Sequence, residues 1–111
     1  MNISLENKTV LVTGAAGFIG AFLAEELLRR FRSVHVVGID SMNDYYEVSL
    51  KEYRLEKLRK LAEEREKSGC RFSFVRGNMA DKALVTKIFA DYKPSVVVNL
   101  AAQAGVRYSI Q

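Results

Sequence analysis

The chain has 111 residues, of which 49% are hydrophobic and 27% charged, and its formal net charge is +4 at pH 7. This length allows one domain, and this composition is typical of a folded globular protein and excludes an intrinsically disordered one. No apolar run approaches the roughly 20 residues of a membrane span, and no basic segment followed by an apolar core marks a secretory signal, so we expect a cytoplasmic protein without a membrane partner.

The first predicted elements are a short buried strand over Thr9–Thr13 and a helix over Phe18–Phe31. Gly14, Gly17 and Gly20 have the spacing of a dinucleotide-binding turn between them. Gly14 permits the tight turn, Gly17 lets the backbone approach the phosphates, and Gly20 lets helix and strand pack closely. The helix start directs its unpaired amide groups at the anion. The expected cofactor-binding residues in this segment are Gly14, Ala16, Gly17, Phe18, Ile19 and Gly20.

The second predicted strand covers Ser33–Ile39 and is followed by Asp40, about 20 residues beyond the last glycine of the turn. A carboxylate at this place accepts hydrogen bonds from the adenosine ribose of NAD and repels the 2′-phosphate of NADP, and no Arg or Lys follows before Lys51. NAD is therefore the expected cofactor, with Ser41 and Asn43 included in its site. The alternative is that Asp40 merely caps a turn.

A long helix is predicted over Val48–Ser68, and Gly69 supplies its stop signal. Its expected apolar stripe consists of Leu50, Leu55, Leu58, Leu61 and Ala62. Most basic residues lie between Lys51 and Lys67, interleaved with glutamates. This pattern is typical of a solvated helix face rather than of a surface that binds nucleic acid.

The last predicted elements are a strand over Arg71–Val75, a helix over Lys82–Asp91 and a strand over Ser95–Leu100. Asn78, just past the third strand, is expected to meet the adenine edge with Met79 beside it, and Asp81 to cap the helix. After the fourth strand, small side chains would let a cofactor lie close to the backbone; this part of the expected site consists of Leu100, Ala101 and Ala102. No metal site is expected. Cys70 and His35 belong to no catalytic motif and are interpreted as structural.

Alternating strands and helices predict an α/β fold, a Rossmann-like doubly wound parallel sheet with strand order 3-2-1-4. A doubly wound domain normally continues into further βα units. We therefore interpret residues 1–111 as one NAD-binding domain, truncated after the fourth strand, without the C-terminal part for catalysis and substrate binding. The exposed edge of the fourth strand then predicts a homodimer or other self-association.

Three segments resemble the extended short-chain dehydrogenase/reductase family of nucleotide-sugar enzymes. They are Thr13-Gly-Ala-Ala-Gly-Phe-Ile-Gly20, Gly38-Ile-Asp40 and Asn99-Leu-Ala-Ala102. Two more, Asn43-Asp-Tyr-Tyr-Glu-Val-Ser-Leu-Lys51 and Ala101-Ala-Gln-Ala-Gly-Val-Arg-Tyr-Ser109, are similar to the UDP-glucuronate 4-epimerase branch. The chain departs from the family pattern at three positions: Ser41 and Asn99 replace the usual Asn and His, and Asn78 replaces an acidic residue.

The resemblance implies NAD-dependent oxidation at C4 of a nucleotide sugar, turnover of the 4-keto intermediate and re-reduction. It also implies proton transfer by a Ser or Thr with a Tyr-x-x-x-Lys pair after a fifth strand, which this chain lacks, so we expect the chain alone to be inactive. Tyr53 and Lys57 match that pair only by letter, on the charged helix. Arg107 is a candidate substrate contact or a surface residue. The alternatives are a dehydratase or decarboxylase of the same superfamily, or a dinucleotide-binding module without catalysis.

Overall fold

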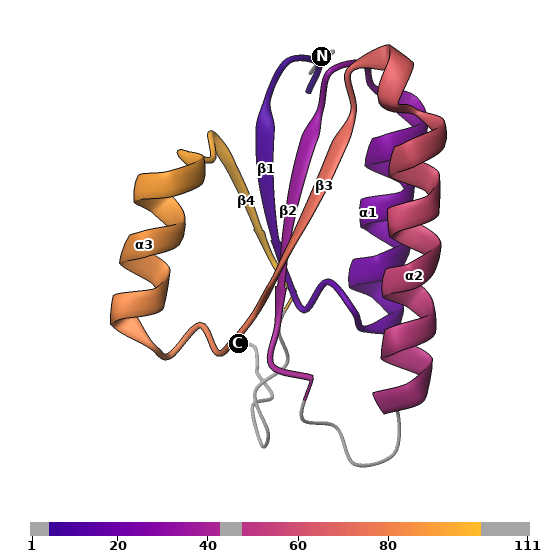
Figure 1. Cartoon of the computed structure of the whole chain (residues 1–111). Helices are drawn as coiled ribbons and strands as arrows, with labels where there is room; N and C mark the ends of the chain where they lie inside the picture. Colours follow the sequence, from indigo (N-terminus) through magenta and orange to yellow (C-terminus); the bar gives the residue numbers. More distant parts are fainter. Residues whose placement is uncertain (1–4, 43–47, 101–111) are drawn as a thin grey trace, which may run out of the picture.

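A four-stranded parallel sheet forms the centre of the computed structural model, which describes residues 5–42 and 48–100 (Figure 1). Its strands are β1 (Thr9–Thr13), β2 (His35–Asp40), β3 (Arg71–Arg76) and β4 (Val96–Asn99), in the order β3-β2-β1-β4. Neighbouring strands all pair in parallel. The predicted fold class and strand order are therefore confirmed, and the carboxyl ends of the strands lie at one edge of the sheet (Figure 1).

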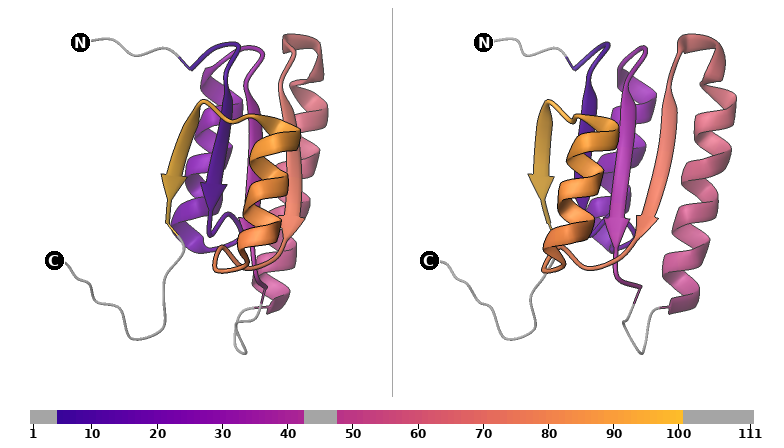
Figure 2. Two further views of the ribbon diagram at one scale, coloured as in Figure 1. Left: turned by 90° about the vertical axis from the view of Figure 1, so that its left-hand side faces the viewer. Right: turned by 60° about the vertical axis from the view of Figure 1, so that its left-hand side comes forward.

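The helices lie on both faces of this sheet. They are α1 (Phe18–Arg30), α2 (Val48–Glu64) and α3 (Lys82–Tyr92), and a short 3-10 turn covers Glu66–Ser68. α1 and α2 cover one face and α3 covers the other (Figure 2). This is the arrangement that right-handed crossovers between parallel strands produce.

Two predicted boundaries were wrong for a local backbone reason. The long helix ends at Glu64, and the chain then makes the 3-10 turn and leaves it through Gly69, whose φ is 83°. Ser33 was predicted to begin the second strand, but its φ of 55° excludes it from extended structure. Instead the Ser33 amide donates a 2.8 Å hydrogen bond to the carbonyl of Ser68, which ties the start of β2 to this turn. The remaining boundaries agree with the predicted ones or differ from them by one residue.

The core consists of two clusters, one on each face of the sheet. Along β1, Val10 and Val12 pack towards α1 and α2, whereas Leu11 packs towards α3. This alternation is that of a strand buried on both faces. The expected stripe on α2 is wrong at Leu50, which is 51% exposed, because five positions on a helix place it about 140° around the axis from the buried Leu55.

The free edge of β4 is partly apolar. Among the described residues β4 pairs with β1 only, and Val97 is 45% exposed. Self-association through this edge stays a prediction. In the part of the chain that the structure describes, no helix is long and apolar enough to cross a membrane.

Cys70 is buried between the end of α1 and the start of β3. Its side chain is part of the core at 1% exposure, and its thiol donates a 3.0 Å hydrogen bond to the carbonyl of Phe31. This environment supports the structural interpretation of the residue.

His35 connects three elements at the sheet edge opposite the carboxyl ends. Its Nδ1 accepts a hydrogen bond of 3.3 Å from Arg71, and its Nε2 lies 2.8 Å from the hydroxyl of Ser73. Its ring meets Tyr92 of α3 edge-on at 5.6 Å. Because a guanidinium has no acceptor, Nδ1 must carry the lone pair and Nε2 the proton. Burial and, secondly, the charge of Arg71 lower the pKa of His35 from its ordinary value of 6.5.

This environment predicts a loss of stability in mild acid. A lowered folded-state pKa means that the unfolded chain takes up the proton first, so the contribution of neutral His35 is complete above the unfolded pKa and declines as the pH falls below it. We expect the free energy of unfolding by urea to be lower at about pH 5.5 than at about pH 7.5. His35 is the one histidine of the sequence, so His35→Gln should flatten this dependence; an unchanged slope in the variant would contradict the assignment.

Candidate functional site

The loop between β1 and α1 crosses the carboxyl end of β2. Gly14, directly after β1, has a φ of 69°, which favours glycine. The amides of Gly14 and Ala15 both donate to the carbonyl of Ile39, at 2.8 and 3.2 Å. The loop is thereby fixed to β2 at the position where the acidic residue of that strand follows.

Gly20 brings α1 into direct contact with this loop. A Cβ on Gly20 would overlap the carbonyl oxygen of Gly14 and lie 2.8 Å from its carbonyl carbon. Glycine is therefore required here by close approach, as the sequence analysis expected. A Cβ on Gly17, in contrast, would lie 3.3 Å from that oxygen, so Gly17 is tight without being blocked.

The first turn of α1 presents unsatisfied backbone donors. Gly17 is the N-cap and contributes no side-chain hydrogen bond. Within the described part of the chain, the amides of Phe18, Ile19 and Gly20 have no hydrogen-bond partner, and the first amide bonded back is that of Ala21, to the carbonyl of Gly17 at 2.9 Å. Phe18 and Ile19 are also 76% and 64% exposed. Amides in this position are suited to holding an anionic group.

Asp40 lies at the end of β2 and links the β1–α1 loop to the segment that follows β2. Its Oδ2 accepts a 3.0 Å hydrogen bond from the amide of Ala16, and its Oδ1 accepts one of 2.9 Å from the amide of Met42. The residue is 6% exposed. Asp40 therefore closes a local turn, which was the alternative interpretation, and also holds the loop between β1 and α1.

Two basic residues on α2 were not predicted as part of this site. Lys51 forms an ion pair with Asp40 Oδ1 at 3.0 Å, with 13% of the lysine side chain exposed. Arg54 donates a 3.0 Å hydrogen bond to the carbonyl of Ala16. Their i, i+3 spacing places both on one helix face, and this spacing was the available signal. The expectation that α2 presents a solvated charged face does not hold at these two positions, because both cations are directed at the β1–α1 loop and the end of β2.

The ends of β3 and β4 complete the edge. Asn78 is exposed, and its Oδ1 accepts a 2.8 Å hydrogen bond from the amide of Ala80, so its side chain supports the loop before α3. Met79 packs against the α3-side core. Asp81 caps α3 by accepting from the Leu84 amide at 3.1 Å, as predicted.

β1 and β4 are joined at their ends by a threonine hydroxyl. Thr13 donates to Asn99 Oδ1 at 2.6 Å, and the amide of Leu100 donates to the Thr13 hydroxyl at 2.7 Å. Asn99, which stands where the family pattern has His, therefore closes the strand pair. Ser41 is partly buried directly after Asp40. Four expected site residues, Asn43, Ala101, Ala102 and Arg107, lie outside the described residues.

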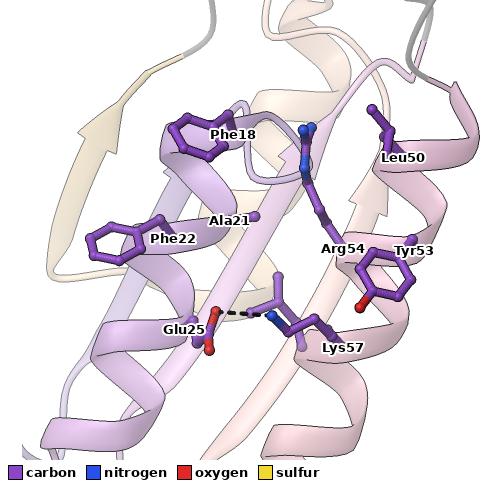
Figure 3. Close-up of a pocket in the computed structure, with 9 residues that line it drawn as sticks. Phe18, Ala21, Phe22, Glu25, Leu50, Tyr53, Arg54 and Lys57 are labelled. Atoms are coloured by element: carbon purple, nitrogen blue, oxygen red, sulfur yellow. Dashed lines mark ion pairs between the residues drawn. The ribbon is translucent and has the colours of Figure 1, made fainter.

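A groove of about 320 Å³ lies between α1 and α2, next to the loop (Figure 3). Phe18 and Phe22 of α1 and Tyr53 of α2 line it, and Lys57 lies 3.9 Å from Glu25 across it. Tyr53 is 62% exposed on this outer surface. Tyr53 and Lys57 thus lie on the outer side of α2, next to α1. No group of three or more metal-ligating side chains occurs among the residues described.

Comparisons with known proteins agree with this architecture. Protein CapI of Staphylococcus aureus is 47% identical over 102 residues, which cover 92% of this chain and 27% of that protein. UDP-glucuronate 4-epimerase 4 of Arabidopsis thaliana is 44% identical over 103 residues, which cover 93% of this chain and 21% of that protein. The chain thus spans about a quarter of the length of these relatives.

A solved structure of UDP-glucose 4-epimerase from Stenotrophomonas maltophila, with bound NAD and formylated UDP-arabinopyranose, superposes with a TM-score of 0.63 at 26% identity. The match covers 86% of this chain and 25% of that one. The family model described as GDP-mannose 4,6 dehydratase matches residues 11–111. The resemblance to nucleotide-sugar enzymes of the short-chain dehydrogenase/reductase type is confirmed, and the chain belongs to the family that this model describes.

Proposed function

We propose that this chain binds NAD at the carboxyl edge of its sheet. The observation that carries the proposal is the hydrogen bond from the Ala16 amide to Asp40, which attaches the glycine loop to the end of β2. The loop leads directly into the first turn of α1, where the amides of Phe18, Ile19 and Gly20 have no partner among the described residues. The amides suit the pyrophosphate, and the carboxylate suits the adenosine ribose. The close contact of Gly20 with Gly14 places the first turn of α1 directly against the loop.

We further propose that the protein is a nucleotide-sugar 4-epimerase that acts on UDP-glucuronate. The likeness to the plant UDP-glucuronate 4-epimerases supports this assignment. NAD, when bound, supplies the hydride acceptor for oxidation at C4 of the sugar. The residues of this chain bind and orient it, and the sugar and the proton-transferring groups are expected to meet it from the part of the protein that follows β4 in the relatives.

The second candidate is a dehydratase or decarboxylase of the same superfamily, and the family model, described as a dehydratase, favours it. A dinucleotide-binding module without catalysis is the third. A full-length protein incubated with UDP-glucuronate and NAD distinguishes them by NMR of the products. We expect inversion at C4 with the carboxylate retained, whereas release of carbon dioxide indicates a decarboxylase. A dehydratase needs a hydroxyl at C6, which UDP-glucuronate lacks, so a parallel incubation with GDP-mannose tests it: a 4-keto-6-deoxy product indicates a dehydratase, and no turnover of either sugar indicates a binding module.

Cofactor choice is tested on this chain itself by calorimetry. We expect NAD to bind about tenfold more tightly than NADP or better, because a 2′-phosphate would lie against the Asp40 carboxylate and like charges at contact are costly. Lys51 moderates this discrimination, since its ammonium lies 3.0 Å from the same carboxylate. The matched control is Lys51→Met, which should widen the preference for NAD. Tighter binding of NADP by the unmodified chain would contradict the role given to Asp40.

A further inference from the structure

The peptide groups of Ala16 are held from two sides. Its amide donates to Asp40 of β2, and its carbonyl accepts from Arg54 of α2, each at 3.0 Å. Ala16 is fully buried. The loop is therefore attached to two different elements at a single residue, and only one of these attachments involves a group that meets the cofactor in the proposed function.

The direction of the Ala16 carbonyl matters for anion binding. The peptide that contains it continues to Gly17, whose amide donates a 3.0 Å hydrogen bond to the carbonyl of Gly14. Because glycine permits a reversed peptide at little steric cost, the hydrogen bonds at the two ends of this peptide are what fix its orientation. In the reversed orientation the carbonyl oxygen would point where the Gly17 amide now points, towards the carbonyl oxygen of Gly14, so the loop would have to change its shape next to the first turn of α1. A hydrogen bond from a guanidinium holds the carbonyl on the other side, and such charge-assisted bonds are about twice as strong as neutral ones.

Arg54 is itself fixed in this position. Its side chain extends from α2 to the N-terminal end of α1, beside Phe18 (Figure 3), with the guanidinium 6.0 Å from the centre of that ring. Contact of a guanidinium with an aromatic face is favourable. Arg54 also precedes Leu55, which is 4% exposed and anchors α2 on the core. The donor is thus carried by a helix that is packed independently of the loop.

We propose that Arg54 is a positioning residue for the phosphate-binding loop. It acts through the Ala16 carbonyl, keeps the loop in its anion-binding shape before any ligand arrives, and needs no contact with the cofactor to do so. The expected effect on NAD affinity rests on the proposed function. The effect on loop conformation does not, because it is a property of the unliganded protein. The apparent affinity for a ligand is proportional to the fraction of molecules whose loop is already in the binding conformation, so a residue that raises this fraction raises the affinity by the same factor.

The test compares Arg54→Gln with Arg59→Gln, which removes the same charge from an exposed position on the same helix. Amide hydrogen exchange of the unliganded protein should be about tenfold faster at Ala16 and Gly17 in Arg54→Gln, with sheet amides such as that of Val36 unchanged and Arg59→Gln like wild type. NAD affinity should fall about tenfold in Arg54→Gln only. If the glutamine variant does not fold, Arg54→Lys replaces it in the same comparison, with faster loop exchange still expected because a lysine lacks the planar fork.

Unchanged exchange at Ala16 and Gly17 in the folded Arg54 variant overturns the proposal, whether or not the protein binds NAD. An equal loss of NAD affinity in both variants also overturns it, because the effect is then one of overall charge. If wild type does not bind NAD, the proposed function fails, while the exchange rates still decide whether Arg54 holds the loop.

Discussion

Gly20→Ala is expected to lower the free energy of unfolding by about 3 kcal/mol, at the upper end of the cost of overpacking a tight contact, and to abolish measurable NAD binding. The added methyl group would overlap the carbonyl oxygen of Gly14, a backbone atom of a residue that is itself held to β2 by its amide. Relief requires α1 to move away from β1, which displaces the amides proposed to bind pyrophosphate. Urea unfolding and calorimetry with NAD measure the two effects.

Gly17→Ala is the matched control, since it adds the same methyl group three residues earlier. Its Cβ would lie 3.3 Å from the same carbonyl oxygen, and its φ of −74° is accessible to alanine. We expect stability within about 1 kcal/mol of wild type, because reduced freedom of the unfolded chain offsets a small adjustment. Equal losses in both variants would show that close approach at Gly20 is not the cause.

Asp40→Ala is the second change with a large expected effect, a destabilisation of about 3–5 kcal/mol. It leaves the Lys51 ammonium, with 13% of its side chain exposed, without a carboxylate partner among the described residues, and it removes the acceptor of the Ala16 and Met42 amides. An unpaired buried charge is much more costly than the pair is favourable. Unfolding by urea measures the loss directly.

A double-mutant cycle separates these contributions. Asp40→Ala combined with Lys51→Met should recover part of the lost stability, because the unpaired charge is gone while the two amides still lack their acceptor. Glu25→Ala is the surface control. It breaks an exposed i, i+4 pair with Arg29, and such pairs contribute about 1 kcal/mol or less. If the double variant is no more stable than Asp40→Ala, the charge of Lys51 is not what Asp40 compensates.

The sheet order and the glycine loop followed from local patterns in the sequence. The apolar run Val10-Leu-Val12 is typical of a strand buried on both faces. The spacing of the glycines at 14, 17 and 20 is typical of a turn between such a strand and a helix. Short alternating elements leave few topologies once crossovers are right-handed. For this reason the order β3-β2-β1-β4 could be predicted without any knowledge of contacts.

The tertiary roles of single side chains could not be predicted in the same way. Lys51 and Arg54 belong to a helix rich in charged residues, and the sequence does not show which charges turn inward. That depends on the rotation of α2, which Leu55 and Leu58 set by packing against the core. Likewise the pairing of Thr13 with Asn99 joins residues 86 positions apart. Asp40 was assigned to the ribose, and its hold on Ala16 became visible only when the loop was seen to cross the end of β2.

Because Cys70 is buried, the reactivity of its thiol measures how often the folded chain opens. Cys70 is the one cysteine in the sequence, and its thiol lies against Phe31 at 1% exposure. A thiol reagent therefore reacts only after α1 and β3 separate, so the rate of labelling follows the population of opened molecules when closing is fast. The stability of variants at Gly20, Asp40 and Arg54 becomes measurable in the absence of denaturant, with no introduced probe.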